Sequence, residues 1–279
     1  MTSRQNHYYT KSELNHLLPL KNGKVIDLKT LEIRNKTDVE NFNFELEFES
    51  LTDFSKVNIF FRNIFDNEDD IQFLQTQLGY CVTGELDDSM KNIIFFTGIG
   101  HGKTTLCDLL NRTLNVLCAR LRREQFIEKP SLSDDEEDDN YDETCLEMAN
   151  LIGKRLCTVQ LNNSNEVDRG LLKQLIGRDR IIARKQDDNY RSYKLMSKYI
   201  FECNHFTETV SDEAWLKRII CVPFTKNLLS CENTNIDLNE FFSWLCVGAS
   251  NYYKLGCKIP ESILNATQNI THIEAIDRK

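Results

Sequence analysis

The segment FFTGIGHGKTTL, residues 95–106, carries residue types that can bind the phosphates of a nucleotide. A glycine-rich turn between a strand and a helix can curl its backbone N–H groups around phosphate oxygens, and the helix N-terminus adds a favourable dipole. Gly100 and Gly102 would allow the backbone to approach the phosphates closely. Lys103 would then reach the β and γ phosphates, and the Thr104 hydroxyl would bind Mg²⁺.

The match to the phosphate-loop pattern G-x-x-x-x-G-K-[ST] is imperfect, because Thr97 stands at the first glycine position and Gly98 follows one residue late. An ordinary glycine turn with Lys103 facing solvent is the alternative interpretation. The apolar strand pattern before the turn and the amphipathic helix pattern after it favour a phosphate loop. The residues predicted to contact the nucleotide are Thr97, Gly98, Ile99, Gly100, His101, Gly102, Lys103, Thr104 and Thr105.

Two further polar residues follow predicted strands at the edge where a parallel sheet presents its ligand site. The segment from Leu156 to Leu161 ends in Gln160, and no carboxylate follows until Glu166. The segment KYIFECN ends in Asn204, which could hold the γ-phosphate or the attacking water. A turn residue that merely ends the strand is the alternative interpretation of Asn204.

Residues 169–198 form a basic tract, with nine Lys and Arg against three Asp and a net charge of +6. Tyr190 and Tyr193 are interleaved with these charges, so the tract could follow a phosphate backbone while the aromatic faces meet bases. A solvated surface that balances the acidic segment of the chain is the alternative. Lys217 and Arg218 precede another predicted strand, and an Arg that enters a neighbouring subunit's site can stabilise phosphoryl-transfer charge.

The elements that must position these residues alternate between strand and helix. The apolar run IIFF after Asn92 predicts a buried strand, and helical spacing of leucines from Leu106 to Leu117 predicts a helix within residues 104–121. Short β-rich segments follow in RLCTVQL, KYIFECN and RIICVPF. This alternation predicts an α/β core with a mostly parallel sheet.

The two ends of the chain have different patterns. Extended patterns in KVIDL and FELEFESL surround the turn-like LKNGK, and a helical pattern begins near Asn58, which together predict a small mixed N-terminal region. The last part, from FFSWLCVG onward, has amphipathic helical spacing with a break at Pro260. We therefore expect an N-terminal region over residues 1–75, a core over 76–228 and a C-terminal helical segment over 229–279.

Composition excludes several classes of protein. The 279 residues carry 34 Lys and Arg against 43 Asp and Glu, but residues 134–143 alone hold eight acids, so the remainder is near neutral and is no uniformly basic nucleic-acid coat. We expect a solvated acidic insert over 124–146. The ten cysteines include no C-x-x-C pair and the five histidines share no metal-ligand spacing, which predicts reduced thiols and no zinc site. No secretory signal or membrane span is predicted, so we expect an intracellular protein that does not act in a membrane.

The segments in this order resemble the superfamily 3 helicase module of poxvirus-type and phage or plasmid primase-helicases, which is a relative of AAA+ ATPases. His101 stands in the phosphate loop where the family usually has Asn. The similarity extends over nearly the whole chain. It is carried by LPLKNGKVIDLKTLEI, FLQTQLGYCVTGEL, the phosphate loop, LIGKRLCTVQ, LLKQLIGRDRIIARK, KYIFECNHF, EAWLKRIICVPF and FFSWLCVGASNYYKLGCKIPESILNAT.

The resemblance implies an AAA+-like P-loop core and an ATP-dependent DNA helicase module of a viral or mobile-element replication protein. Such a module works as an oligomeric ring, here expected to be a hexamer, on single-stranded DNA in the cytoplasm or nucleus of the host cell. The resemblance places Asn204 at the γ-phosphate sensor, Arg218 at the arginine finger of the neighbouring subunit, and ATP with Mg²⁺ at the phosphate loop. The residues it implies in DNA contact are Lys173, Arg184 and Lys185.

The sequence departs from the family in two respects. Gln160 occupies the position of the glutamate that orients the attacking water, so the alternative is a hydrolysis-deficient nucleotide- and DNA-binding subunit, or a degenerate relic of such a helicase. No primase segment precedes the helicase motifs, which implies either a fragment of a longer primase-helicase or a separate primase or polymerase partner.

Overall fold

The structure is a computed structural model that describes residues 14–40, 42, 44–98, 102–127, 147–161, 167–177, 180–183, 190–204, 213–226 and 236–272. Its strands are β1 (Leu17–Leu20), β2 (Lys24–Asp27), β3 (Ile33–Asn35), β4 (Ile93–Thr97), β5 (Cys118–Leu121), β6 (Leu156–Gln160), β7 (Arg180–Ala183), β8 (Arg191–Lys194), β9 (Lys198–Glu202) and β10 (Ile219–Pro223). Its α-helices are α1 (Ser55–Ile64), α2 (Glu68–Val82), α3 (Lys103–Leu114), α5 (Arg169–Ile176), α6 (Glu213–Leu216), α7 (Leu238–Leu255) and α8 (Glu261–His272).

A five-stranded sheet in the order β10-β4-β9-β6-β5 forms the centre of the molecule, and all four of its strand pairs are parallel. The predicted α/β core with a mostly parallel sheet is therefore confirmed. Every residue of β4 and β9 is buried, as expected of parallel strands that are covered on both faces. The β4 strand lies between β10 and β9, so the segment that follows it has a strand end on either side.

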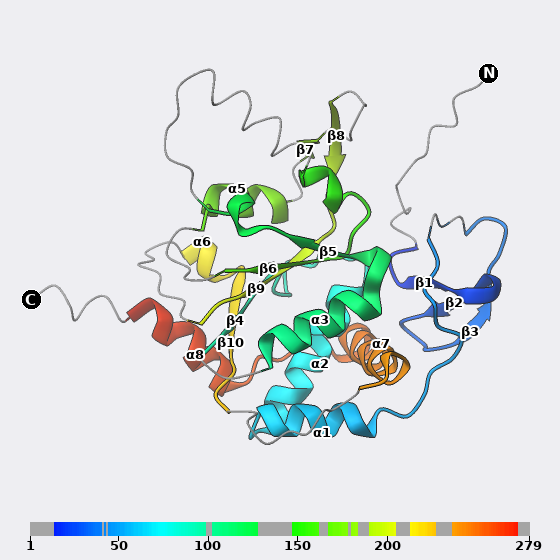
Figure 1. Ribbon diagram of the computed structural model, residues 1–279, viewed down its shortest axis with the longest axis horizontal. Coiled ribbons are helices and arrows are strands. Elements are labelled where there is room, and N and C mark those ends of the chain that lie inside the picture. The colour runs from blue at the N-terminus through cyan, green and yellow to red at the C-terminus, as the bar shows by residue number, and fades with distance from the viewer. Residues whose placement is uncertain are drawn as a thin grey trace, which may run out of the picture.

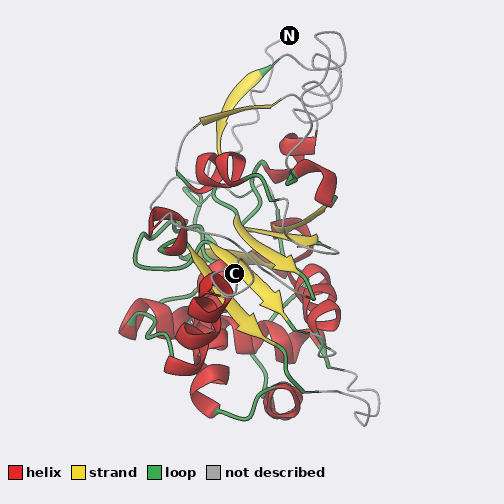
Figure 2. Ribbon diagram, turned by 90° about the vertical axis from the view of Figure 1, so that its left-hand side faces the viewer, coloured by secondary structure: helices red, strands yellow, loops and turns green. Residues whose placement is uncertain are grey.

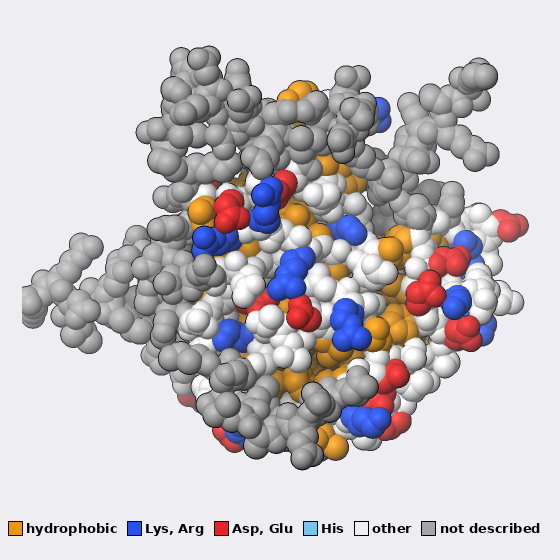
Figure 3. Space-filling model, in the orientation of Figure 1, with side chains coloured by type: hydrophobic (Ala, Val, Ile, Leu, Met, Phe, Trp, Pro, Cys, Tyr) orange, Lys and Arg blue, Asp and Glu red, His pale blue; other side chains and the backbone are white. Residues whose placement is uncertain are grey.

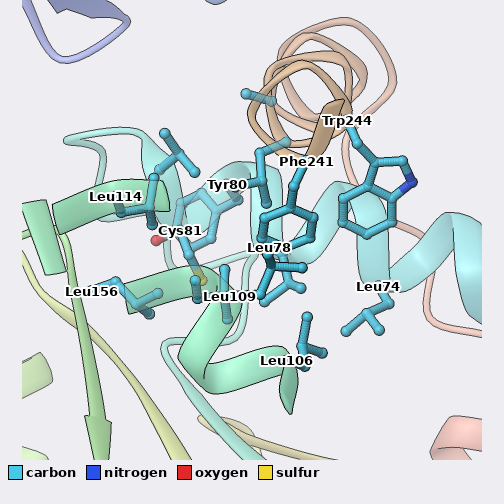
Figure 4. Packing of buried hydrophobic residues seen from close by; sticks show 14 of the residues in the cluster. Leu74, Leu78, Tyr80, Cys81, Leu106, Leu109, Leu114, Leu156, Phe241 and Trp244 are labelled. Carbon is cyan, nitrogen blue, oxygen red and sulfur yellow. The ribbon is translucent and has the colours of Figure 1, made fainter. Parts of the chain in front are cut away.

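Alternate residues of the strands enter two separate hydrophobic clusters, one on each face of the sheet. Ile94 and Phe96 of β4 pack with α2, α3 and α7, whereas Ile93 and Phe95 pack on the opposite side with residues of α5 and with Trp215. Figure 1 shows α1, α2, α3 and α7 on one side of the sheet and α5 on the other, and Figure 2 shows the strands between them. Figure 4 shows the first cluster, where α2, α3 and α7 meet.

Two glycines let α2 and α7 cross at very short range. A Cβ at Gly79 would lie 2.1 Å from the backbone nitrogen of Ala249, and a Cβ at Gly248 would lie 2.0 Å from the carbonyl oxygen of Gln75. A larger residue at either position would force the backbones of α2 and α7 apart. Trp244 of α7 packs on Phe61 of α1 with ring centroids 4.4 Å apart, which joins a third helix to this pair.

The sequence-based helix within residues 104–121 is only partly correct. The α3 helix ends at Leu114, Asn115 adopts φ = 35°, and Cys118–Leu121 form the edge strand β5, which pairs with β6. The leucine spacing continued past the end of the helix because Leu117 is buried in the turn and Leu121 in the strand. Burial of apolar residues at short spacing is common to both structures, so periodicity alone did not separate them.

The N-terminal strands β1, β2 and β3 form an antiparallel sheet that is hydrogen-bonded to the core. Buried Arg155, just before β6, donates to the carbonyl oxygens of Val82 at 2.8 Å and Leu17 at 3.1 Å. The extended pattern in KVIDL corresponds to β2, whereas the described residues of FELEFESL form no regular strand. Leu46 makes an isolated parallel bridge with Leu20, and the N–H groups of Leu46 and Lys21 donate to the carbonyl oxygens of Pro19 and Phe48.

The free edge of β10 is covered by α8. Thr267 of α8 accepts a hydrogen bond from the Cys221 backbone nitrogen at 3.1 Å and donates one to Ile263 of its own helix. An edge strand otherwise exposes backbone groups that can pair with another chain. The C-terminal helical pattern and its break at Pro260 are confirmed by α7 and α8.

The acidic insert begins later than expected. Phe126 is fully buried and packs edge-on against Phe201, so the first residues of the expected segment 124–146 belong to the core. Residues 128–146, which include the acidic run, lie outside the described residues. On the face shown in Figure 3, positive and negative side chains are mixed among the described residues, in agreement with the near-neutral charge of the rest of the chain.

Candidate nucleotide site

Lys103 is the first residue of α3, at the helix end that follows β4. The preceding Gly102 adopts φ = 115°, a conformation that favours glycine and turns the chain into the helix. The Lys103 side chain is buried, and its Nζ donates a hydrogen bond back to the Gly98 carbonyl oxygen. Burial lowers the pKa of Lys103, whereas Cys203 and Glu202 act in the opposite direction. The amine therefore lies across the beginning of the glycine turn.

Gly98 explains why the glycine of this loop comes one residue late. It adopts φ = 93°, and a Cβ would lie 2.5 Å from the Phe224 carbonyl oxygen. Thr97, by contrast, is the last residue of β4, where its carbonyl accepts from the Phe224 backbone nitrogen at 2.8 Å. The position after the strand, rather than the strand end itself, thus needs the glycine.

Asn204 lies beside this turn, as its place after a neighbouring strand predicted. Its carbonyl oxygen accepts a hydrogen bond from the Gly98 N–H at 3.0 Å, and its side chain is exposed. Thr104 and Thr105 are also exposed on the first turn of α3. The structure therefore brings Gly98, Lys103 and Asn204 to one edge of the sheet. Ile99, Gly100 and His101 lie outside the described residues.

Gln160 is the exposed last residue of β6, and its register partner on β9 is Glu202. Sequence reasoning missed Glu202, which is only 3% exposed although it carries a carboxylate. No described N–H or O–H group donates a hydrogen bond to either of its carboxylate oxygens, and its neighbour on α3 is the weakly donating Cys107 thiol. Arg120 lies near it, with Nη2 3.9 Å from the carboxylate. The signal was present in KYIFECN, where one acid interrupts an apolar strand.

Arg218 is not brought to this edge of the sheet. It precedes β10, and its carbonyl oxygen accepts from Ile93 at the start of β4, so it lies at the amino edge. Five residues of β10 at about 3.3 Å each place it roughly 17 Å from the glycine turn. Its side chain is exposed there. Arg218 is therefore far from Lys103 of the same chain.

The basic tract divides into parts with different surroundings. Lys173 is half-buried on α5, and Arg184 and Lys185 lie outside the described residues. Lys198 does not belong to a basic surface, because it is fully buried in β9 and donates to the Thr83 carbonyl oxygen at 2.7 Å. The Tyr80 ring faces the same ammonium, with its centroid 4.6 Å from Nζ. The count of basic residues in the tract therefore overstated its surface charge.

The hairpin formed by β7 and β8 does expose cations. Its register pairs Arg180 with Lys194 and Ile182 with Ser192, which places these four side chains on one face of the hairpin. Arg180, Ile182 and Lys194 are exposed, whereas Ile181 and Ala183 of the other face are buried. Figure 1 shows the hairpin projecting from the sheet beyond α5. Exposed Tyr190 directly precedes β8.

The described residues contain no cluster of three or more His, Cys, Asp and Glu that would bind a metal by itself. The eight cysteines within the described ranges are free, and seven of them are buried. A search of the described helices found none that is long and apolar enough to span a membrane. A nucleotide-bound cation does not need such a cluster, because phosphate oxygens and water supply most of its ligands.

No protein-family model matches the chain, and no curated protein sequence matches it. An apo structure of the NrS-1 C-terminal region has a similar fold, with a TM-score of 0.55 at 14% sequence identity over 81% of this chain and 52% of that one. The A form apo structure of the same region gives a TM-score of 0.49 at 16% identity over 81% and 51%. The chain thus spans about half the length of these structures, and the similarity with the first concerns the fold.

Proposed function

We propose that this chain is an ATP-dependent DNA helicase module of a viral or mobile-element replication protein and acts as an oligomeric ring. The observation that carries the proposal is the meeting of Lys103, Gly98 and Asn204 where β4 and β9 end at the same edge of the parallel sheet. Ligands of open α/β sheets bind at such edges. The fold shared with the NrS-1 C-terminal region supports the architecture that this function requires.

Each residue at this edge has a chemical task in the proposal. Lys103 exchanges its bond with the Gly98 carbonyl for one with the β and γ phosphates, and the exposed Thr104 hydroxyl binds Mg²⁺. The cation neutralises the developing charge on the phosphates when it is bound. The Asn204 amide reaches the γ-phosphate or the water beside it. Because its backbone is bonded to Gly98, Asn204 moves with the turn that holds the phosphates.

The proposed ring assigns a task to Arg218. In its own chain it lies at the opposite edge of the sheet, so it stabilises transition-state charge in the neighbouring subunit's site. The expected assembly is a hexamer, in which each nucleotide lies between two subunits. An Arg218→Ala variant should therefore bind the nucleotide but fail to hydrolyse it, and mixing it with Lys103→Ala should restore part of the turnover at mixed interfaces.

The proposed DNA contact is the outer face of the β7–β8 hairpin together with Lys173, Arg184 and Lys185. Arg180 and Lys194 flank exposed Ile182 on that face, an arrangement in which cations meet phosphates and an apolar side chain meets a base or sugar. Changing Arg180 and Lys194 to Ala should lower the salt dependence of single-stranded DNA binding by about 1.4 in slope. The exposed pair Lys254 and Lys258, on and after the end of α7, provides the matched control, whose removal should leave the slope unchanged.

The decisive experiment measures ATP hydrolysis by the purified protein with and without single-stranded DNA. DNA-stimulated turnover that disappears in Lys103→Ala supports the proposal, since that variant lacks the amine that holds the phosphates. Wild-type protein that neither binds nor hydrolyses ATP contradicts it.

A second candidate function is favoured by Gln160, which stands at the end of β6 where the family has a glutamate. It is a nucleotide- and DNA-binding subunit without hydrolysis. ATP binding without turnover in the wild type, and turnover gained in Gln160→Glu, would select this candidate.

A further inference from the structure

Glu202 occupies the same face of the central sheet as Gln160, one strand nearer to the phosphate loop. Its register partners are Phe96 on β4 and Gln160 on β6, and register partners on neighbouring parallel strands project to the same face. That face is covered by α3, because Ile200, two residues earlier on β9, packs in the cluster that contains Leu106. Glu202 therefore lies under the helix whose first residues are Lys103 and Thr104, with β4 directly beside it.

The Glu202 carboxylate is poorly compensated by the described residues. It is 3% exposed, its neighbour on α3 is the Cys107 thiol, which is a weak donor, and neither of its oxygens accepts an N–H or O–H hydrogen bond from the described residues. Arg120 lies 3.9 Å away and is shared, because its other guanidinium nitrogen contacts Asp108 at 2.6 Å. A buried carboxylate without hydrogen bonds is costly, and such groups in proteins are normally paired or coordinate metals. One guanidinium therefore serves two carboxylates, and Lys103 at the start of α3 adds a Coulombic attraction to Glu202.

Gln160 and Glu202 together retain the one acidic group that a nucleotide site of this kind needs. Neighbouring strands are about 4.8 Å apart, so a carboxylate at both register positions would place two like charges side by side. The neutral amide of Gln160 avoids that pair of like charges at this end of β6 and β9. The acidic group at this end of the sheet is thus on β9, at Glu202, instead of on β6, at Gln160.

We propose that Glu202, rather than a residue of β6, is the carboxylate that holds the divalent cation of the bound nucleotide, directly or through water. This inference rests on the proposed nucleotide-binding function. Thr104 contributes the hydroxyl from α3, and Glu202 contributes the carboxylate from the strand next to β4. Glu202, at the end of the neighbouring strand, then supplies the carboxylate that the helicase family has at the position of Gln160.

The test measures divalent-cation binding rather than turnover. Paramagnetic resonance of Mn²⁺ reports the cation bound with a non-hydrolysable ATP analogue, and the affinity of that analogue is titrated with and without Mg²⁺. In Glu202→Gln we expect the Mg²⁺-dependent gain in affinity to fall at least tenfold, while metal-free binding remains. The exchanged variant Gln160→Glu/Glu202→Gln should recover most of the gain, whereas Gln160→Glu alone should weaken it through repulsion.

Asp108→Asn is the matched control, because it removes the other acidic contact of Arg120 and leaves the proposed cation ligand in place. The inference is overturned if Glu202→Gln keeps the wild-type Mg²⁺-dependent gain in affinity for the ATP analogue. It is also overturned if Asp108→Asn loses as much of this gain as Glu202→Gln does, because Glu202 would then be only a counter-ion of Arg120. If Glu202→Gln does not fold, Glu202→Asp replaces it and should show an intermediate loss, while unchanged metal dependence overturns the inference. If Lys103→Ala abolishes nucleotide binding but the Glu202 variants have no effect on metal dependence, this inference alone is refuted. If the wild type binds no nucleotide, both proposals are refuted.

Discussion

Replacing Gly79 with Ala should separate α2 from α7 and destabilise the whole domain. The new Cβ would lie 2.1 Å from the Ala249 backbone nitrogen, whereas an ordinary contact is about 3.5 Å, so the helices would have to move apart by roughly 1.4 Å. The obstacle is backbone, which cannot rotate away as a side chain can. We place the overpacking cost at about 3 kcal/mol, the upper part of the usual range. Alanine regains about 1 kcal/mol of helix propensity, which leaves a net loss of about 2 kcal/mol.

Urea unfolding followed by circular dichroism measures this loss, and Gly170→Ala is the matched control. Gly170 is also a helical glycine, but its Cβ would meet only the Asp168 side chain, at 3.2 Å. Because no backbone obstructs its Cβ, we expect that variant to be as stable as the wild type or up to about 1 kcal/mol more stable. Gly79→Ala combined with Gly248→Ala should cost less than the sum of the two single changes, because both force the same separation. A Gly79→Ala protein as stable as the wild type would refute this account of the helix crossing.

Three further changes test other contacts. Burial lowers the pKa of Lys198 to about 7, so above pH 7 the folded protein releases a proton that the unfolded chain keeps, and stability should rise up to the ordinary lysine pKa. In urea titrations at pH 7 to 8.5, the free energy of unfolding of the wild type should increase relative to Lys198→Met by up to about 1.4 kcal/mol per pH unit. Equal pH dependence in the two proteins would contradict this. Thr267→Val removes the acceptor of the Cys221 N–H and should lower stability by about 1 kcal/mol in thermal unfolding, whereas Thr267→Ser should keep it. Hydrogen bonds from Arg34 hold the pKa of Glu40 at about 2, so the stability advantage of the wild type over Glu40→Gln should be full above pH 4.5 and disappear as the pH falls towards 2; an advantage independent of pH would rule this out.

The central strands and the glycine turn were predictable because their signals are local. The apolar run IIFF predicted β4, short β-rich segments predicted β6, β9 and β10, and the order of strand, turn and helix around Lys103 predicted the place of the glycine turn. The position of Asn204 beside Gly98 followed from a general property of parallel sheets, whose strand ends meet at one edge.

The misses have non-local causes. Lys198 was counted as a surface charge because its partners, the Thr83 carbonyl and the Tyr80 ring, lie more than a hundred residues away in the sequence. The acid in KYIFECN was visible in the sequence, but its position next to Gln160 depends on the register of β6 and β9, which the sequence does not specify. The end of α3 was misplaced because β5 exists only through its pairing with β6, which follows a long intervening segment. Tertiary contact overrode the local pattern in each case.

The hydrogen bonds of Arg155 also determine when the N-terminal strands can finish folding during synthesis. The carbonyl oxygen of Leu17 in β1 accepts a hydrogen bond from a guanidinium that lies 138 residues later in the chain. At about 5 to 20 residues per second, a ribosome needs roughly 7 to 28 s to make that stretch. The strand β1 can pair with β2 as soon as both have been made, because only a short turn separates them. The side-chain bonds that attach this sheet to the core can form only after Arg155 has been made, so attachment is a later and longer-range event than pairing within the sheet.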